Sequence, residues 1–129
     1  MFNTIFLFLK KHPYITLFLA LFWTIGIFIG CSMPGKDLPS ISVFDHFDKV
    51  VHFTFFAVFY ILWYLFFYKI KYIAIILLFI VFLYGFGIEF YQLNCIEGRS
   101  FDVWDGVADT VGGFIAYFIV SFLNQKRLN

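Results

Sequence analysis

The sequence predicts an all-α integral membrane protein, a four-helix bundle with both its N- and C-termini in the cytoplasm. Hydrophobic residues make up 63% of the 129 residues and charged residues only 13%, which is about half the charged share of a soluble domain. Four segments approach the roughly 20 apolar residues that a helix needs to cross a bilayer. The formal net charge of +1 provides no basic surface for nucleic acid, so no nucleic-acid partner is expected.

Short polar segments separate the four predicted spans and leave no room for a soluble domain. The first span follows Pro13, which favours a helix start, and ends before Pro34. The second stops at the turn Lys69-Ile70-Lys71, where the third begins, and the fourth ends before Asn124. The connection 34–47 is rich in Pro, Ser and Asp, and is predicted to be a surface loop or a short interfacial helix. A single transmembrane domain over residues 1–129 therefore contains helices at about 14–33, 50–68, 72–91 and 103–123.

The distribution of charge predicts the orientation. Short cytoplasmic loops carry an excess of Lys and Arg. With the N-terminus inside, six basic residues lie in the cytoplasm (Lys10, Lys11, Lys69, Lys71, Lys126 and Arg127) and three outside (Lys36, Lys49 and Arg99). All eight acidic residues then fall on the outer half: Asp37, Asp45, Asp48, Glu89, Glu97, Asp102, Asp105 and Asp109. The sequence thus predicts a multi-pass membrane protein, with its polar residues facing the extracytoplasmic side.

Small residues near the end of the first span allow further interpretations. Gly26 and Gly30 form a small-x-x-x-small motif, which predicts close contact with another helix. Cys31 follows an apolar run like that of a lipoprotein signal, but the run is longer than the usual 7–15 residues, so we retain it as a span. Cys31 and Cys95 are placed where one disulfide is allowed in an oxidising compartment. Two free thiols are the simpler prediction.

The start of the second span carries the first polar group. Asp45, Asp48, Lys49 and His52 share one helical face through spacings of three, four and seven residues. Either Asp could serve only as a helix N-cap. His52 lies one turn into the apolar run, where it is either a histidine hydrogen-bonded within the bundle or a functional group.

Glu89 and Gln92 form a second group near the outer end of the third span, with Gly85 one turn below on the same face. A carboxyl inside an apolar span is costly and is a functional candidate by default. The structural alternative is an ion pair or a hydrogen-bond latch, for example with Arg99.

The third group leads from the last loop into the fourth span. Asp102, Asp105 and Asp109 follow Arg99 and line one stripe through spacings of three and four. Asp102 and Asp105 resemble a helix cap, which leaves Asp109 unexplained two turns into the membrane. Small residues every four positions predict close approach of another helix at Ala108, Gly112 and Ala116.

These motifs together resemble the VanZ-like family of bacterial membrane proteins, which is named for a teicoplanin-resistance protein. The resemblance runs from about Phe28 to Tyr117 and places its motifs on the expected helices. In order, they are Cys31-Ser32-Met33-Pro34-Gly35, Asp48-Lys49-Val50-Val51-His52-Phe53, Glu89-Phe90-Tyr91-Gln92, and Gly98-Arg99 followed by Asp105 and Gly112-Gly113. The resemblance implies a protein of the bacterial cytoplasmic (inner) membrane with a role in the cell envelope and in tolerance to lipoglycopeptide antibiotics. One departure is Asp109, where the family pattern has Asn.

The leading hypothesis is a polar site that binds or modifies an amphiphilic envelope component, such as a membrane lipid, an envelope precursor or a glycopeptide antibiotic. The candidates for catalysis are His52, Glu89 and Asp105, and those for substrate binding are Asp48, Lys49, Gln92, Arg99, Asp102 and Asp109. Oxygen-rich ligands with one His would suit a hard or borderline cation, but no tight metal-ligand motif is present, so no metal ligands are assigned. No cofactor is identified.

Two alternatives remain open. The chain could be a proton- or ion-coupled carrier in which Glu89 and Asp109 titrate, and four spans per chain would then require a homo-oligomer. Alternatively, the polar residues could form interhelical latches in a structural partner of an envelope complex.

Overall fold

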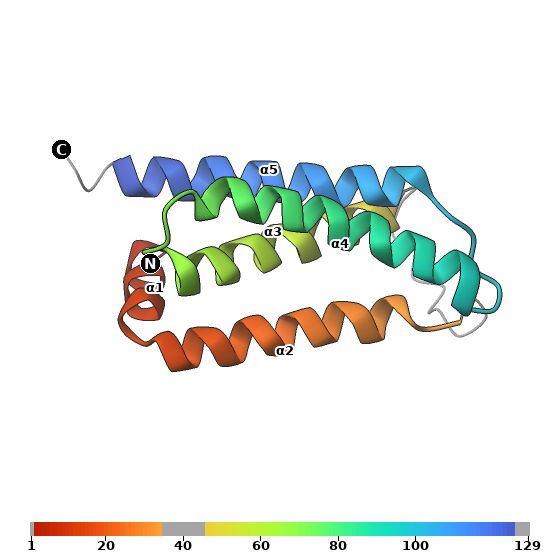
Figure 1. Cartoon of the computed structure of the whole chain (residues 1–129), viewed down its shortest axis with the longest axis horizontal. Coiled ribbons are helices and arrows are strands. Elements are labelled where there is room, and N and C mark those ends of the chain that lie inside the picture. Colours follow the sequence, from red (N-terminus) through yellow and green to blue (C-terminus); the bar gives the residue numbers. More distant parts are fainter. Residues whose placement is uncertain (1, 35–45, 126–129) are drawn as a thin grey trace.

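The computed structural model describes residues 2–34 and 46–125, and this part of the chain is all-helical, with no strand (Figure 1). Four of its helices, α2 to α5, are long and apolar enough to cross a membrane, which confirms the predicted class. The segment 35–45, most of the predicted loop, lies outside the described residues, as does Asp45. The helices are α1 (Phe2–Lys11), α2 (Pro13–Cys31), α3 (Phe47–Phe67), α4 (Ile73–Cys95) and α5 (Val103–Gln125).

The sequence did not predict α1, because ten residues are too few to cross a bilayer. The helix is amphipathic, and Phe6 on its apolar face is buried. Lys10 Nζ donates a hydrogen bond of 2.9 Å to Asn124 Oδ1 and lies over the rings of Phe6 and Tyr68. These contacts hold α1 against the ends of α3 and α5, at the end of the bundle away from the acidic residues (Figure 1).

Two of the spans have boundaries that change where the polar residues lie. Helix α3 begins three residues earlier than predicted, so Asp48 and Lys49 belong to its first turn. Helix α4 continues four residues further than predicted, so Gln92 lies inside the helix. The turn at Lys69-Ile70-Lys71 separates α3 from α4, as predicted.

Helix α3 is the centre of the bundle, because it contacts each of the other four helices. Its closest approach is to α5: a Cβ at Gly112 would lie 2.2 Å from the backbone oxygen of Phe53. Ala116, one turn further along α5, is fully buried. The small-residue strip predicted on this helix therefore does bring another helix close, and it fixes the relative position of α3 and α5.

The other small-residue prediction, at Gly26 and Gly30, is wrong within the described residues. A Cβ at either position would have no atom within 4 Å. The reason is that α2 packs through a different face, which buries Ala20, Ile27 and Cys31. Cys31 is buried and Cys95 is exposed, and both are free thiols, which confirms the simpler of the two predictions.

Candidate functional site

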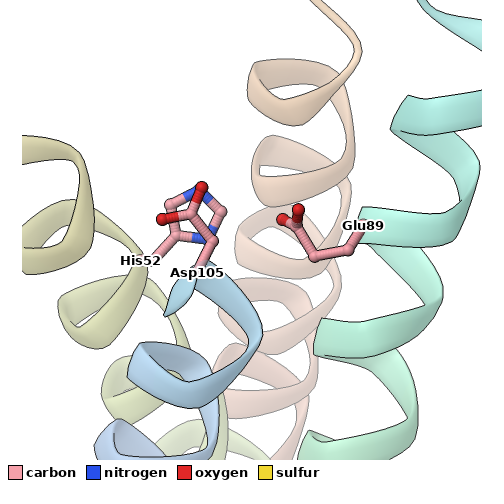
Figure 2. A group of neighbouring side chains, drawn as sticks. All are labelled: His52, Glu89 and Asp105. Atoms are coloured by element: carbon pink, nitrogen blue, oxygen red, sulfur yellow. The ribbon is translucent and has the colours of Figure 1, made fainter. Parts of the chain in front are cut away.

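The start of α3, the end of α4, the start of α5 and the end of α2 lie at the same end of the bundle (Figure 1). Polar side chains from these segments contact one another there. Figure 2 shows His52 on α3 and Asp105 on α5 next to each other, with the Glu89 carboxyl on α4 turned toward them. One potential ligand atom from each of these three residues lies within 4.8 Å of the others. The three candidates for catalysis are therefore brought together from three helices.

His52 is oriented by Asp109. The distance from His52 Nδ1 to Asp109 Oδ1 is 3.0 Å, and both side chains are buried. The second ring nitrogen of His52 points away from this contact and lies 3.8 Å from Asp105 Oδ2, too far for a hydrogen bond. A carboxylate at Nδ1 that leaves Nε2 unused is the arrangement that positions a histidine for proton transfer or metal ligation.

Gly85 on α4 makes room for this pair. A Cβ there would lie 2.9 Å from both Cβ and Oδ2 of Asp109, closer than real Cβ contacts. Oδ2 itself is buried without a hydrogen-bond partner in the described part of the chain. The buried Asp109 carboxylate is thus satisfied on one side only, by His52.

Glu89 is fully buried inside α4. Its Oε2 accepts a hydrogen bond of 3.0 Å from the backbone N–H of Asp102, whereas Oε1 has no partner among the residues that the structure describes. No lysine or arginine of those residues lies within 4 Å of this carboxyl, so the alternative of an ion pair with Arg99 is wrong. We call Glu89, His52, Asp105 and Asp109 the buried cluster.

Lys49 organises a second, more exposed group. Its ammonium lies 2.7 Å from Asp48 Oδ2, 2.5 Å from Asp102 Oδ2 and 2.7 Å from Asp105 Oδ1. The hydrogen bond from Lys49 holds the pKa of Asp102 below its ordinary value, and the backbone N–H of Trp104 acts in the same direction. We call Asp48, Lys49 and Asp102 the rim cluster, and Asp105 connects it to the buried cluster.

The structure settles which acids cap helices. Asp102 precedes α5 and accepts a hydrogen bond of 2.8 Å from the backbone N–H of Trp104, so it caps the helix as predicted. The residue before α3 is His46, which has a φ of 66° and makes no side-chain cap. Asp48 is therefore not an N-cap; it lies in the first turn, where a negative charge favours the helix dipole.

Gln92 and Arg99 stand apart from the clustered acids. Gln92 Nε2 donates a hydrogen bond of 2.9 Å to the backbone oxygen of Cys31, which connects α4 to the end of α2. Arg99 is half-buried, and its Nε is buried without a hydrogen-bond partner in the described residues. Both residues remain candidates for binding, but the structure shows a structural contact for Gln92.

A groove of about 990 Å³ runs along the outside of the contact between α3 and α5. The rim cluster and His46 lie at its polar end. The rest of its lining is apolar, and none of these apolar residues was among the site candidates predicted from the sequence. Trp104, Val107 and Val111 follow one another at helical spacing, and this was the signal that the sequence offered. The structure leaves all three side chains exposed. The apolar lining consists of Val50, Phe53, Trp104, Val107, Ala108 and Val111.

Comparison with known proteins identifies the family of this chain. A family model described as VanZ/LLP1 matches residues 2–124, nearly the whole chain. No curated protein and no solved structure matches the chain. Three of the residues that carry the resemblance, His52, Glu89 and Asp105, come from three different spans and offer ligand atoms within 4.8 Å of one another. The chain is a multi-pass membrane protein that belongs to the VanZ/LLP1 family.

Proposed function

We propose that the chain binds an amphiphilic component of the bacterial cell envelope at the extracytoplasmic end of its bundle. The observation that carries the proposal is the groove between α3 and α5, which has charged residues at one end and apolar side chains along its length. Membership of the VanZ/LLP1 family supports a role in the envelope.

The groove matches the two parts of an amphiphile. Its apolar lining faces the region that lipid occupies in a membrane, because Val107 and Val111 belong to the exposed side of a spanning helix. Trp104, at the polar end, is 70% exposed, and tryptophan prefers the level of the lipid headgroups. An apolar chain can therefore lie along Val107 and Val111 while its headgroup reaches the rim cluster.

The charges at the polar end select the headgroup. Asp48, Asp102 and Asp105 surround the single ammonium of Lys49, so negative charge is in excess. A cationic or hydroxyl-rich headgroup fits this surface better than a bare phosphate does. Any modification of the headgroup would draw on His52, Glu89 and Asp105, which are connected to the groove by the ion pair between Asp105 and Lys49.

Binding can be tested with three single-chain amphiphiles of equal length that differ only in the headgroup: a quaternary ammonium, a sugar and a phosphate. The purified protein is expected to bind the first two at least about tenfold more tightly than the phosphate, as measured by quenching of Trp104 fluorescence against a Trp104→Phe blank.

Val111→Trp should fill the groove and abolish this preference, whereas Phe122→Trp, on the exposed side of the same helix but at its other end, should retain it. Equal binding of all three amphiphiles, or an unchanged preference in Val111→Trp, would contradict the proposal.

The same variants test the role in the cell. Production of the wild-type chain is expected to raise tolerance to a lipoglycopeptide more than to a glycopeptide without a lipid chain. The physical reason is that only the lipidated drug, or the envelope component it competes with, has an apolar chain for the groove. Tolerance is measured by growth inhibition in a strain lacking the chain, complemented with the wild type, Val111→Trp or Phe122→Trp.

A further inference from the structure

The buried cluster contains more negative charge than the protein compensates. Glu89, Asp105 and Asp109 contribute three carboxylates to a region where each residue is at most 7% exposed. Lys49 reaches Asp105 but neither of the other two, and His52 contacts Asp109. Burying an unpaired carboxylate is costly, so either protons or a cation must complete the site.

The rim cluster shows how this chain satisfies such a group when it uses its own side chains. There, the ammonium of Lys49 occupies the space between Asp48, Asp102 and Asp105. No equivalent side chain of the described residues reaches Glu89, and its Oε1 is buried without a partner. The fully buried Glu89 carboxyl is turned toward His52 and Asp105, as Figure 2 shows.

We propose that His52, Glu89 and Asp105 bind a divalent metal ion. His52 would ligate through Nε2, because Nδ1 is held by Asp109 at 3.0 Å, the outer-shell carboxylate that metal-ligating histidines characteristically carry. The distance of 3.8 Å from Nε2 to Asp105 Oδ2 lets both atoms reach one ion through bonds of about 2.0–2.2 Å. Glu89 supplies the third ligand from α4 after a small side-chain adjustment.

The ligand set selects the ion. One imidazole nitrogen and two carboxylates suit a cation of intermediate hardness, which means Mn²⁺ or Zn²⁺ rather than Mg²⁺ or Ca²⁺. With His52 neutral, the two charges of the ion balance those of Glu89 and Asp105, while Asp109 accepts a hydrogen bond from Nδ1 of His52. The site goes beyond the amphiphile groove and does not depend on it, since the metal alone can be tested on the purified protein.

The experiment measures binding of Zn²⁺, Mn²⁺, Mg²⁺ and Ca²⁺ to metal-stripped protein in detergent, by calorimetry and by the shift in thermal unfolding. One Zn²⁺ or Mn²⁺ per chain is expected, with a raised unfolding temperature. Glu89→Gln and Asp105→Asn should each weaken binding at least about tenfold. Glu97→Gln, the same change at an exposed position just beyond the end of α4, is the matched control and should bind like the wild type.

Two further variants separate this site from its surroundings. Asp109→Asn should weaken binding about tenfold, because it loosens the orientation of His52. Asp48→Asn, in the rim cluster, should weaken metal binding less than Glu89→Gln or Asp105→Asn does. An ion that binds the wild type and Glu89→Gln equally lies outside the buried cluster, and so does an ion that is lost only in Asp48→Asn. Either result, or the absence of binding to the wild type, overturns the proposal.

Discussion

Lys49 joins the two polar groups of the site, because its ammonium contacts Asp105 as well as both acids of the rim cluster. Its side chain is 21% exposed, so these ion pairs are screened less than surface pairs but are not desolvated. A single residue on the first turn of α3 therefore holds the start of α5 in place. The hydrogen bond from the backbone N–H of Asp102 to Glu89 connects the residue that precedes α5 to α4.

Replacement of Lys49 by Met keeps the length of the side chain and removes its charge. We expect a loss of about 1–3 kcal/mol in the free energy of unfolding at pH 7, between the values for surface and buried ion pairs. Lys49→Arg, which retains the charge, should lose less than half as much. Denaturant unfolding of the purified proteins in detergent measures these differences.

The loss should depend on pH in a defined direction. In the wild type, Lys49 lowers the pKa of Asp102 from its ordinary value of 3.8. The stabilisation from this carboxylate is therefore complete above that pH and disappears as the pH falls through the lowered value. Wild type and Lys49→Met should differ most near neutrality and converge below about pH 4. A difference that stays constant down to pH 3 would instead assign the loss to packing.

The surroundings of Asp109 show what an Asp does at the position where the family resemblance leads us to expect Asn. Its Oδ1 contacts His52, and its methylene and Oδ2 fill the space that Gly85 leaves open. Asn has nearly the same shape, so it could keep the contact to His52 with one charge less. The negative charge of Asp109 adds to those of Glu89 and Asp105, and the proposed metal ion would offset part of this total.

At the level of the helices, the contact between α3 and α5 determines the position of the site. Gly112 on α5 lies against the backbone of Phe53, one residue after His52. Backbone atoms cannot rotate away as a side chain can. The distance between His52 and the acids on α5 therefore depends on the absence of a side chain at Gly112.

Gly112→Ala should destabilise the protein by about 1–3 kcal/mol or more, because the new Cβ would lie 2.2 Å from the backbone oxygen of Phe53 and the helices must separate. Gly26→Ala is the matched control, because its Cβ enters open space and Ala favours a helix by up to about 1 kcal/mol. Thermal unfolding in detergent compares the two. Equal losses in both would mean that helix propensity, and not the approach of α3, determines the effect.

For the molecule as a whole, the cysteines report which side of the membrane carries the site. Cys95 at the end of α4 is exposed, and Cys31 is buried. If the site faces outward, a membrane-impermeant maleimide should label the wild type in intact cells, and Cys95→Ser should lose the label. In a Cys95→Ser background, Lys69→Cys at the other end of the bundle should be labelled only after permeabilisation. The reverse pattern would place the site in the cytoplasm and contradict the orientation predicted from basic residues.

Much of the molecule follows from the sequence, because the relevant signals are local. About twenty apolar residues in a row specify a membrane helix, since a helix satisfies its backbone polar groups within one segment and lipid offers them no partners. Capping by Asp102 and the close approach at Gly112 also follow from residue type and spacing. The positions of His52, Glu89 and Asp105 near the outer ends of three predicted spans likewise placed them at one level of the bundle.

Contacts between helices could not be derived in this way. The pairing of His52 with Asp109, the bond from Gln92 to Cys31 and the groove beside Val107 all join residues far apart in the chain. The same holds for the proposed metal ligands, which come from three helices and so show no short motif. Periodicity gives the face of a helix but not the rotation of that face against its neighbours, and packing at positions such as Gly112 and Gly85 sets that rotation. The sequence by itself therefore determined the membrane class and the level of the site, and the tertiary structure alone decided which side chains meet there.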